Sequence, residues 1–393
     1  MTGASSPETG VLTGIRVADF SRILAGPYAS MMLADFGADV VKIESPDGDD
    51  TRSWLPPVDE TGSSTYFASV NRNKRSLVCD LRTEQGLAEA RQLADSADVV
   101  IENFRPGVME RFGLDEQTLR RANPGLIYCS ITGFGRGAGA QLSGYDLLVQ
   151  AVGGLMSITG ESHGEPAKVG VAVVDVLTGL NAFSGILLAL RERDRTGLGQ
   201  RIDVDLLTSL LSALTNQAAS TLATGASPAR LGNAHPSIAP YEVFAAADRK
   251  IVIAVGNDRQ FRALAELLGV AEIANDVRFG TNEARVRHRE ALCALLTARL
   301  GEQKASWWVE QCAAASVPAG LVNSIAEAFE FADTLGLEAV TELRDTDSGR
   351  ASRQVSNPIH LARTPPRHRA LPPQLDQHNG AQWHEARTDK GTL

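Results

Sequence analysis

The chain has 393 residues, 43% of them hydrophobic and 22% charged, so it is long enough for two globular domains. Its net charge of −9 disfavours a nucleic-acid partner or an anionic membrane surface, and any anionic ligand would need a local basic site. The four cysteines and seven histidines lack metal-site spacing, and we see neither a signal peptide nor an apolar run near the ~18 residues of a membrane span. We therefore expect a cytoplasmic protein with no metal.

The N-terminal third alternates short apolar segments with longer amphipathic ones. This alternation predicts an α/β fold with a parallel, doubly wound sheet. The expected strands are GIRVADF (14–20), ADVVKIE (38–44), SLVCDL (76–81), DVVIENF (98–104) and GLIYCSITGFG (125–135), and the expected helices are PYASMMLADFG (27–37) and TEQGLAEARQLADSA (83–97).

A second domain is predicted after a mostly helical stretch over residues 145–223. In that stretch Gly179, Ala182 and Gly185 recur every third residue, which would let another helix approach closely. The segment 223–242 is rich in Gly, Ala, Ser and Pro and is expected to be a linker. A strand (KIVIAVG) and two helices follow it, and the Pro- and His-rich tail is expected to run irregularly over a surface.

Several familiar sites are disfavoured by the glycine and serine patterns. Dinucleotide binding needs G-x-G-x-x-G after the first strand, whereas the turn SRILAGPY holds one glycine. The glycine-rich TGFGRGAGA does not match that spacing either. A serine hydrolase would carry G-x-S-x-G, which is absent.

Two basic turns are candidates for binding phosphate. NRNKRS contains Arg72, Lys74 and Arg75, and ENFRPGVMERFG adds Arg105 and Arg111. Such turns are often solvated, but ligands of open α/β sheets gather where strands end. The sequence leaves the two interpretations about equal.

Asp175 lies within the otherwise apolar stretch KVGVAVVDVLTGLNAFSGILLAL. A buried carboxylate is costly unless it is hydrogen-bonded or neutralised. It could be a helix cap or a satisfied buried group, or it could be a nucleophile or general base. Composition and spacing do not decide between these roles.

Taken together, several stretches resemble the class III CoA-transferases, a family that includes formyl-CoA transferase and carnitine CoA-transferase. The resemblance extends from about residue 14 to 378. The matching stretches are GIRVADFSRILAGPYASMMLADFGADVVKIE, NRNKRSLVCDL, DVVIENFRPGVMERFGL, GYDLLVQAVGGLMSITG and VAVVDVLTGLNAFSGILLAL, with a weaker match at LDQHNG.

The resemblance implies that Asp175 is a catalytic nucleophile. In the implied chemistry its carboxylate attacks a donor acyl-CoA to give a mixed anhydride, and the CoA thiolate returns to form an aspartyl-CoA thioester. An acceptor carboxylic acid then takes the CoA. No cofactor is permanently bound, because the coenzyme A thioester is a substrate.

The same resemblance implies a coenzyme A site, a domain plan and an interlocked-ring homodimer. A large Rossmann-like domain would comprise residues 1–205 and 335–393, with a helical linker over 206–225 and a smaller α+β domain over 226–334. The residues expected at coenzyme A are Arg22, Leu24, Ala25, Arg75, Cys79, Asp80, Leu81, Arg82, Asn103, Phe104, Arg105, Arg111, Ser143, Tyr145 and Asp146, with Lys74 a further candidate for its phosphates.

Departures from the family pattern bear on the substrate. Leu24 stands where formyl-CoA transferase has a glutamine, Ser45 stands where it has an arginine, and its glycine-rich loop is missing. The pattern GNAHPSIAPYE…VGNDRQF is more similar to members that use succinyl-CoA and dicarboxylic acids. A distal carboxylate would need a guanidinium partner, for which Arg230, Arg249 and Arg259 are candidates by position.

Two alternatives remain at this point. The α-methylacyl-CoA racemases share the fold but use a histidine in Gly-His-Asp, where this chain has Gly144-Tyr145-Asp146. A tyrosine, whose pKa is near 10, is poorly matched to proton abstraction near neutral pH. A coenzyme A-binding protein without turnover would be expected to have lost the nucleophile, yet Asp175 is present.

Overall fold

The computed structural model describes residues 10–59, 62–345 and 349–384, which form two compact units. The large unit comprises residues up to 153, 169–222 and those from 336 onward, and the small unit comprises 154–168 and 223–335. The segment 154–168, which the family resemblance places in the large domain, clusters with the small unit. Residues 206–222, expected as a linker, cluster with the large unit.

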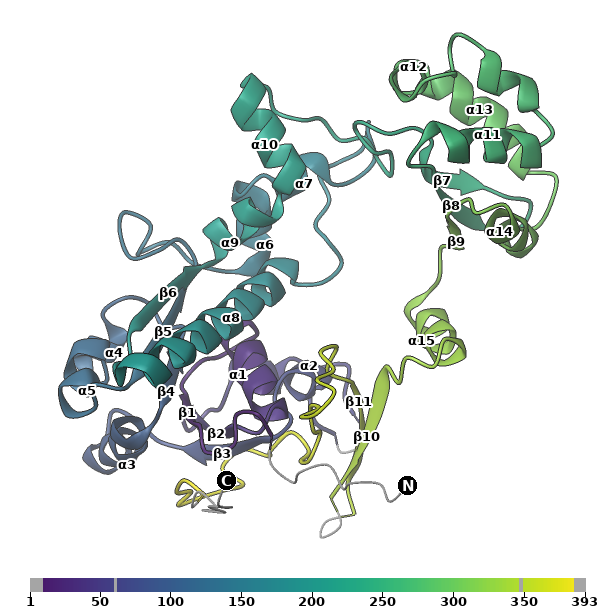
Figure 1. Ribbon diagram of the computed structural model, residues 1–393. Coiled ribbons are helices and arrows are strands. Elements are labelled where there is room, and N and C mark those ends of the chain that lie inside the picture. The colour runs from purple at the N-terminus through teal and green to yellow at the C-terminus, as the bar shows by residue number, and fades with distance from the viewer. Residues whose placement is uncertain (1–9, 60–61, 346–348, 385–393) are drawn as a thin grey trace. The chain divides into compact units, whose positions relative to one another are not determined.

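The large unit contains most of the regular structure (Figure 1). Its strands are β1 (Arg16–Asp19), β2 (Asp39–Glu44), β3 (Lys74–Val78), β4 (Val99–Glu102), β5 (Ile127–Thr132), β6 (Arg201–Asp205), β10 (Val340–Arg344) and β11 (Ala351–Val355). Its helices are α1 (Ala25–Asp35), η1 (Asp50–Ser53), α2 (Thr65–Ser69), α3 (Glu84–Ser96), α4 (Val108–Arg111), α5 (Glu116–Ala122), α6 (Asp146–Val152), α8 (Val173–Thr196) and α9 (Leu206–Ala213), with α10 (Thr215–Thr224) ending at the boundary.

Six of these strands form a parallel sheet in the order β3-β2-β1-β4-β5-β6. The predicted α/β class and parallel sheet are confirmed. None of the predicted strands corresponds to β6, whose residues RIDVD alternate apolar and charged side chains at the edge of the sheet. The strand order reverses between β1 and β4, and such a switch point is where open α/β sheets bind ligands.

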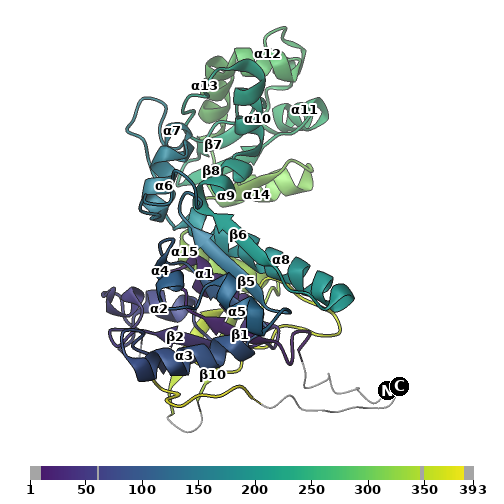
Figure 2. The ribbon, with the colours of Figure 1, turned by 90° about the vertical axis from the view of Figure 1, so that its left-hand side faces the viewer.

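Helices cover both faces of the sheet (Figure 2). On one face α3, α4 and α5 bury an apolar cluster that includes Phe20, Leu93, Leu119 and Tyr128. On the other face lie α1 and α8, with Ser30 of α1 donating a hydrogen bond to Asp19 at 2.5 Å. Because successive side chains of a strand point to opposite faces, β1 gives Ala18 to the apolar cluster and Asp19 to the α1 side.

The 24-residue helix α8 is, within the described residues, the single helix long and apolar enough to cross a membrane. The expectation that no stretch would reach that length was wrong. The helix packs against α1, β5, β6 and α9, and Ala182 and Ile186 in it are fully buried. We therefore assign α8 to the protein core.

The predicted close approach at the small residues of α8 is confirmed. A Cβ placed on Gly179 would lie 2.6 Å from the carbonyl oxygen of Ala25 and 3.2 Å from the Cβ of Tyr28, both on α1. A Cβ on Gly185 would lie 3.1 Å from a methyl group of Ile202 on β6. At Gly179 the backbone of α1 therefore occupies the space that a side chain on α8 would need.

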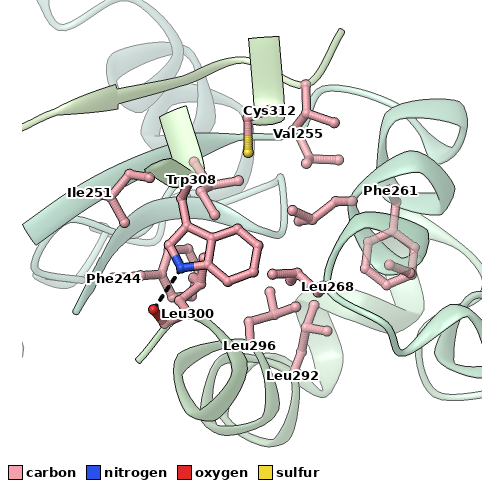
Figure 3. Packing of buried hydrophobic residues seen from close by; sticks show 14 of the residues in the cluster. Phe244, Ile251, Val255, Phe261, Leu268, Leu292, Leu296, Leu300, Trp308 and Cys312 are labelled. Atoms are coloured by element: carbon pink, nitrogen blue, oxygen red, sulfur yellow. Dashed lines mark hydrogen bonds between the residues drawn. The ribbon is translucent and has the colours of Figure 1, made fainter. Parts of the chain in front are cut away.

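The small unit has its own core, around Trp308 (Figure 3). The indole of Trp308 packs among Phe244, Leu268 and Leu296, and its Nε1 donates to the carbonyl of Leu300 at 2.8 Å. The three-stranded antiparallel sheet has the order β7-β8-β9. The elements are α7 (Leu155–Ile158), β7 (Tyr241–Ala245), β8 (Lys250–Ala254), α11 (Asp258–Leu267), η2 (Ala271–Asn275), α12 (Asn282–Arg287), α13 (Arg289–Leu300), α14 (Ala305–Ala314), β9 (Ala319–Leu321) and α15 (Ile325–Thr334).

The C-terminal segment of the large unit covers the edge strand β3. Asp376 accepts a hydrogen bond from the backbone N–H of Val78 at 2.9 Å, and the N–H of His378 donates to the carbonyl of Ser76 at 3.0 Å. An uncovered edge strand would offer these groups to other chains. The LDQHNG stretch, although irregular, thereby completes the sheet.

Replacing Gly179 with alanine is expected to destabilise the protein despite the better helix propensity of alanine. Relief of the glycine penalty is worth up to about 1 kcal/mol, but the new methyl meets a backbone carbonyl at 2.6 Å, and overpacking of this kind costs about 1–3 kcal/mol. Gly185→Ala on the same helix meets a side chain and should stay within about 0.5 kcal/mol of the parent. Urea denaturation measures both, and equal stabilities would contradict the packing account.

Candidate active site

A pocket opens where β1, β4 and β5 end, at the switch point of the sheet. Its walls come from three loops of the large unit and from the start of α8. The lining residues are Arg22, Ile23, Leu24, Ala25, Asp50, Asn103, Phe104, Arg105, Pro106, Ile131, Thr132, Gly133, Phe134, Gly135, Gly139, Ala140, Leu142, Ser143, Gly144, Tyr145, Asp175 and Leu206.

The loop after β1 is held in an unusual backbone conformation. Ile23 has φ of +70°, a region that β-branched residues rarely occupy. Its N–H donates to both carboxylate oxygens of Asp49, at 3.2 and 3.3 Å. Beside it, the Asn103 side chain accepts from the N–H of Arg22 at 2.8 Å and donates to its carbonyl at 2.7 Å. Strain at a pocket wall is thus stabilised by two polar side chains.

Buried ion pairs hold this loop against the sheet. Lys42 and Asp49 are paired at 2.8 Å with both side chains fully buried, and Lys42 also donates to the carbonyl of Ser21 at 2.7 Å. Lys74 pairs with Asp19 at 3.2 Å, again fully buried. Burial lowers the pKa of Lys74 to about 8, although Asp19 opposes that shift. Buried charges are tolerated here because each has a partner and further hydrogen bonds.

A glycine crossing forms the opposite wall. The backbones of Gly133 and Gly144 approach so closely that a Cβ on Gly144 would lie 2.6 Å from the Cα of Gly133. Only residues without a side chain fit this contact. The crossing closes the glycine-rich loop that follows β5, so TGFGRGAGA is part of the pocket wall although it lacks dinucleotide-binding spacing.

Asp175 lies in the first turn of α8 and faces this pocket half-buried. Burial, and then the nearby carboxylate of Asp146, raise the pKa of Asp175 from 3.8 to about 7. A carboxylate of that basicity is a better nucleophile than an ordinary one, and a substantial part of it is ionised near neutral pH. The site therefore supplies a reactive carboxylate next to a ligand-sized opening.

Nine of the sequence-predicted residues line this one pocket. Two of them are basic: Arg22 lies 3.4 Å from Asp50, and Arg105 donates to Ser143 at 3.4 Å. Among the described residues, each guanidinium has one long side-chain contact, and that of Arg22 also lies 5.2 Å from the centre of the Phe104 ring. The nine are Arg22, Leu24, Ala25, Asn103, Phe104, Arg105, Ser143, Tyr145 and Asp175.

The other predicted residues do not line the pocket. Arg75 is paired with Asp39 at 2.7 Å, and Asp80 is paired with the exposed Arg82 at 2.8 Å. The remainder are Cys79, which is buried in the α3-side cluster with Leu81 packed against it, Arg111, which is exposed at the end of α4, and Asp146, which contacts α8.

The phosphate interpretation of NRNKRS was wrong for its buried members. Arg72 forms a bidentate pair with Asp35, at 2.9 and 2.6 Å, and Lys74 is enclosed with Asp19. These cations already have buried carboxylate partners. The turn is a structural anchor.

Tyr66 and Glu102 lie in the surroundings of the site, but neither is among the site residues expected from the sequence. Tyr66 packs against the buried cluster of Leu24, Met31 and Val70, and burial followed by the charge of Asp175 raises its pKa to about 12. Burial raises the pKa of Glu102, at the end of β4, to about 7. Glu102 accepts from the N–H of Phe104 at 2.9 Å. Neither residue lies in a motif with distinctive spacing.

Comparison with known proteins identifies the family of this chain. The sequence profile described as CoA-transferase family III matches residues 12–379. The chain belongs to CoA-transferase family III. Together with the pocket, this membership makes it a class III CoA-transferase, an enzyme whose substrates are coenzyme A thioesters.

Individual family III relatives cover nearly the whole chain. A succinate–glutarate CoA-transferase from Agrobacterium fabrum is 45% identical over 390 residues, 97% of each chain. A succinyl-CoA:glutarate CoA-transferase from Mus musculus is 40% identical over 343 residues, 87% of this chain and 78% of its own. A crystal structure of a CaiB/BaiF family protein from Brucella suis has a TM-score of 0.85 and 44% identity, covering 94% of this chain and 98% of that one. These matches favour the transferase over the racemase and the non-catalytic alternatives.

Removing the Asp175 carboxylate is expected to stabilise the fold in a pH-dependent way. The pKa of this carboxyl is higher in the folded protein than in the unfolded chain. Its contribution to the free energy of unfolding is therefore fully present below pH 3.8 and is lost as pH rises through about 7, because burying the ionised form is costly. Asp175→Asn should therefore raise Tm progressively between pH 5 and 8, reaching a gain of about 2–4 °C. Differential scanning fluorimetry measures this gain.

The control for the Asp175 experiment is Asp194→Asn, which changes an exposed carboxyl on the same helix. Its effect on Tm should not grow across that pH range. A gain for Asp175→Asn that is constant with pH, or that falls as pH rises, would contradict the assigned environment.

Proposed function

We propose that this family III enzyme transfers coenzyme A from succinyl-CoA to a dicarboxylic acid such as glutarate, with Asp175 as the covalent nucleophile. The observation that carries the mechanism is the half-buried Asp175 carboxylate, with a pKa near 7, in the wall of the switch-point pocket. The substrate pair is supported by the Agrobacterium fabrum and Mus musculus relatives, whose names specify succinate or succinyl-CoA and glutarate.

The proposed donor half-reaction has two steps. An oxygen of Asp175 attacks the succinyl thioester carbonyl, the C–S bond breaks, and a mixed anhydride and the CoA thiolate result. The thiolate then attacks the aspartyl carbonyl, which releases succinate and leaves an aspartyl-CoA thioester. Holding the carboxylate against the thioester supplies effective concentration for a group that is otherwise a weak nucleophile.

The acceptor half-reaction reverses these steps with a different acid. A glutarate carboxylate attacks the aspartyl thioester carbonyl, giving a new anhydride and freeing the thiolate. The thiolate attacks the glutaryl carbonyl, so glutaryl-CoA leaves and Asp175 is regenerated. Charge on the tetrahedral oxygens needs hydrogen-bond donors, and the glycine-rich loop after β5 lines the same pocket as Asp175.

A distal carboxylate on both acids calls for a cation. Arg249 is engaged by Glu327 at 2.8 Å and by the carbonyl of Val322 at 2.6 Å, and Arg230 donates to the carbonyl of Gly164 at 2.8 Å. Arg259 is exposed on α11. We propose that Arg22 or Arg105 pairs with the distal carboxylate instead, because both residues line the pocket and the side-chain contacts of their guanidiniums within the described residues are long, at 3.4 Å.

The experiment is a transfer assay with succinyl-CoA and matched acceptors, glutarate and butyrate. We expect glutaryl-CoA formation by the parent enzyme, and a loss of at least about 1000-fold in kcat for Asp175→Asn. Alanine at the correct pocket arginine should raise KM for glutarate about tenfold or more and leave butyrate unaffected. Arg249→Ala is the control for removing a guanidinium outside the pocket.

Other outcomes of that assay would count against particular parts of the proposal. Full activity of Asp175→Asn would exclude the covalent route. Equal losses on glutarate and butyrate would assign the arginine to coenzyme A. No transfer from succinyl-CoA, with transfer from another acyl-CoA, would exclude the donor but retain the chemistry.

The interlocked-ring homodimer that the family resemblance implies is also a proposal. It is supported by exposed apolar side chains on α15 and just after it, where Ile325 is 79% and Leu337 is 59% exposed. A single chain leaves such groups uncovered.

A further inference from the structure

The first turn of α8 has no cap of its own. The residue before the helix, Ala172, has no side chain that can accept from the free N–H groups of the turn. The carboxylate of Asp146, at the start of α6, accepts them instead. Its Oδ1 lies 2.8 Å from the N of Val174 and 3.3 Å from the N of Asp175.

Asp146 is itself fixed by a fully buried amide. Gln150 follows it by one helical turn on α6, and its Nε2 donates to Asp146 Oδ2 at 2.6 Å. The Oε1 of Gln150 accepts from the N–H of Val169 at 2.9 Å, in the segment that leads into α8. The backbone is thus attached to α6 both before the helix and at Asp175 itself.

We propose that Asp146, braced by Gln150, is a positioning residue that holds the Asp175 backbone and thereby aims the nucleophile, and that it does not bind coenzyme A. The inference rests on the proposed role of Asp175. Two observations favour it: Asp146 is absent from the pocket lining, and both of its oxygens are occupied by α8 and Gln150.

The arrangement also places a negative charge beside the nucleophile. Other titratable or charged groups in these surroundings are Tyr66 on α2, on which the charges of Asp175 and Asp146 act, and the pocket residues Arg22, Asp50, Arg105 and Tyr145. A like charge makes a carboxylate more basic, in keeping with the raised pKa of Asp175. Removing the charge while keeping the cap should therefore move the acidic limb of the activity profile to lower pH.

The first experiment is hydrogen exchange on the full-length protein, because it needs no turnover. Asp146→Ala should speed exchange at the amides of Val174 and Asp175 about tenfold or more, since their acceptor is lost. The control is Asp115→Ala, which removes the cap of α5 that accepts from the N–H of Thr118 at 3.1 Å. It should speed exchange at Thr118 and leave α8 unchanged. Unchanged exchange at Asp175 in Asp146→Ala would overturn the proposal.

The second experiment separates positioning from ligand binding. Calorimetry with coenzyme A itself should give Kd values for Asp146→Ala and the parent that agree within about threefold, while kcat falls about 100-fold, the cost of misplacing a reacting group by about 1 Å. A Kd weakened tenfold or more, with kcat retained, would assign Asp146 to the coenzyme A site and overturn the inference.

Two milder variants keep the test valid if Asp146→Ala fails to fold. Asp146→Asn retains an acceptor oxygen and should lower the midpoint of the kcat–pH profile. Gln150→Met preserves volume but not the brace, and should lower kcat without that shift. No midpoint change in Asp146→Asn together with normal kcat in Gln150→Met would overturn the proposal. A parent enzyme inactive with every acid would refute the proposed function, but the exchange experiment would still decide on positioning.

Discussion

The contact between α8 and α1 at Gly179 determines the geometry of the whole site. Because Gly179 has no side chain, α8 can lie directly on the first turn of α1, against the carbonyl of Ala25. Asp175 lies one turn earlier on α8, so the same contact brings it to the pocket wall that Ala25 also lines. A helix held further from the sheet would carry its carboxylate away from the ends of β1 and β4.

Around that contact the protein keeps several charges away from water, and each is compensated by a named partner. Asp49 is bonded to Lys42 and to the strained Ile23 N–H, and Asp146 is bonded to the first turn of α8. Asp175 differs, because its carboxylate is half-buried next to another carboxylate. Burial and then the charge of Asp146 raise the pKa of Asp175 to about 7, and burial raises the pKa of Glu102 at the end of β4 in the same direction.

Sequence patterns predicted the large sheet because its strands and helices have distinct periods and clear ends. They also led to Asp175, through a family resemblance and the anomaly of an acid in an apolar stretch. They failed where a partner is remote in sequence: Arg72 meets Asp35, and Lys74 meets Asp19, so neither cation is available to a phosphate. The positions of Asp146 and Tyr66 beside Asp175 depend on helices packing together, which no local spacing encodes.

The proposed mechanism requires Asp175 to become covalently acylated during transfer. The most direct measurement is to quench a reaction with succinyl-CoA using hydroxylamine and to determine the mass of the peptide that contains Asp175. We expect an aspartyl hydroxamate at Asp175 that is absent from Asp175→Ala. An enzyme that transfers coenzyme A at its full rate but yields no hydroxamate at this residue would contradict the covalent mechanism.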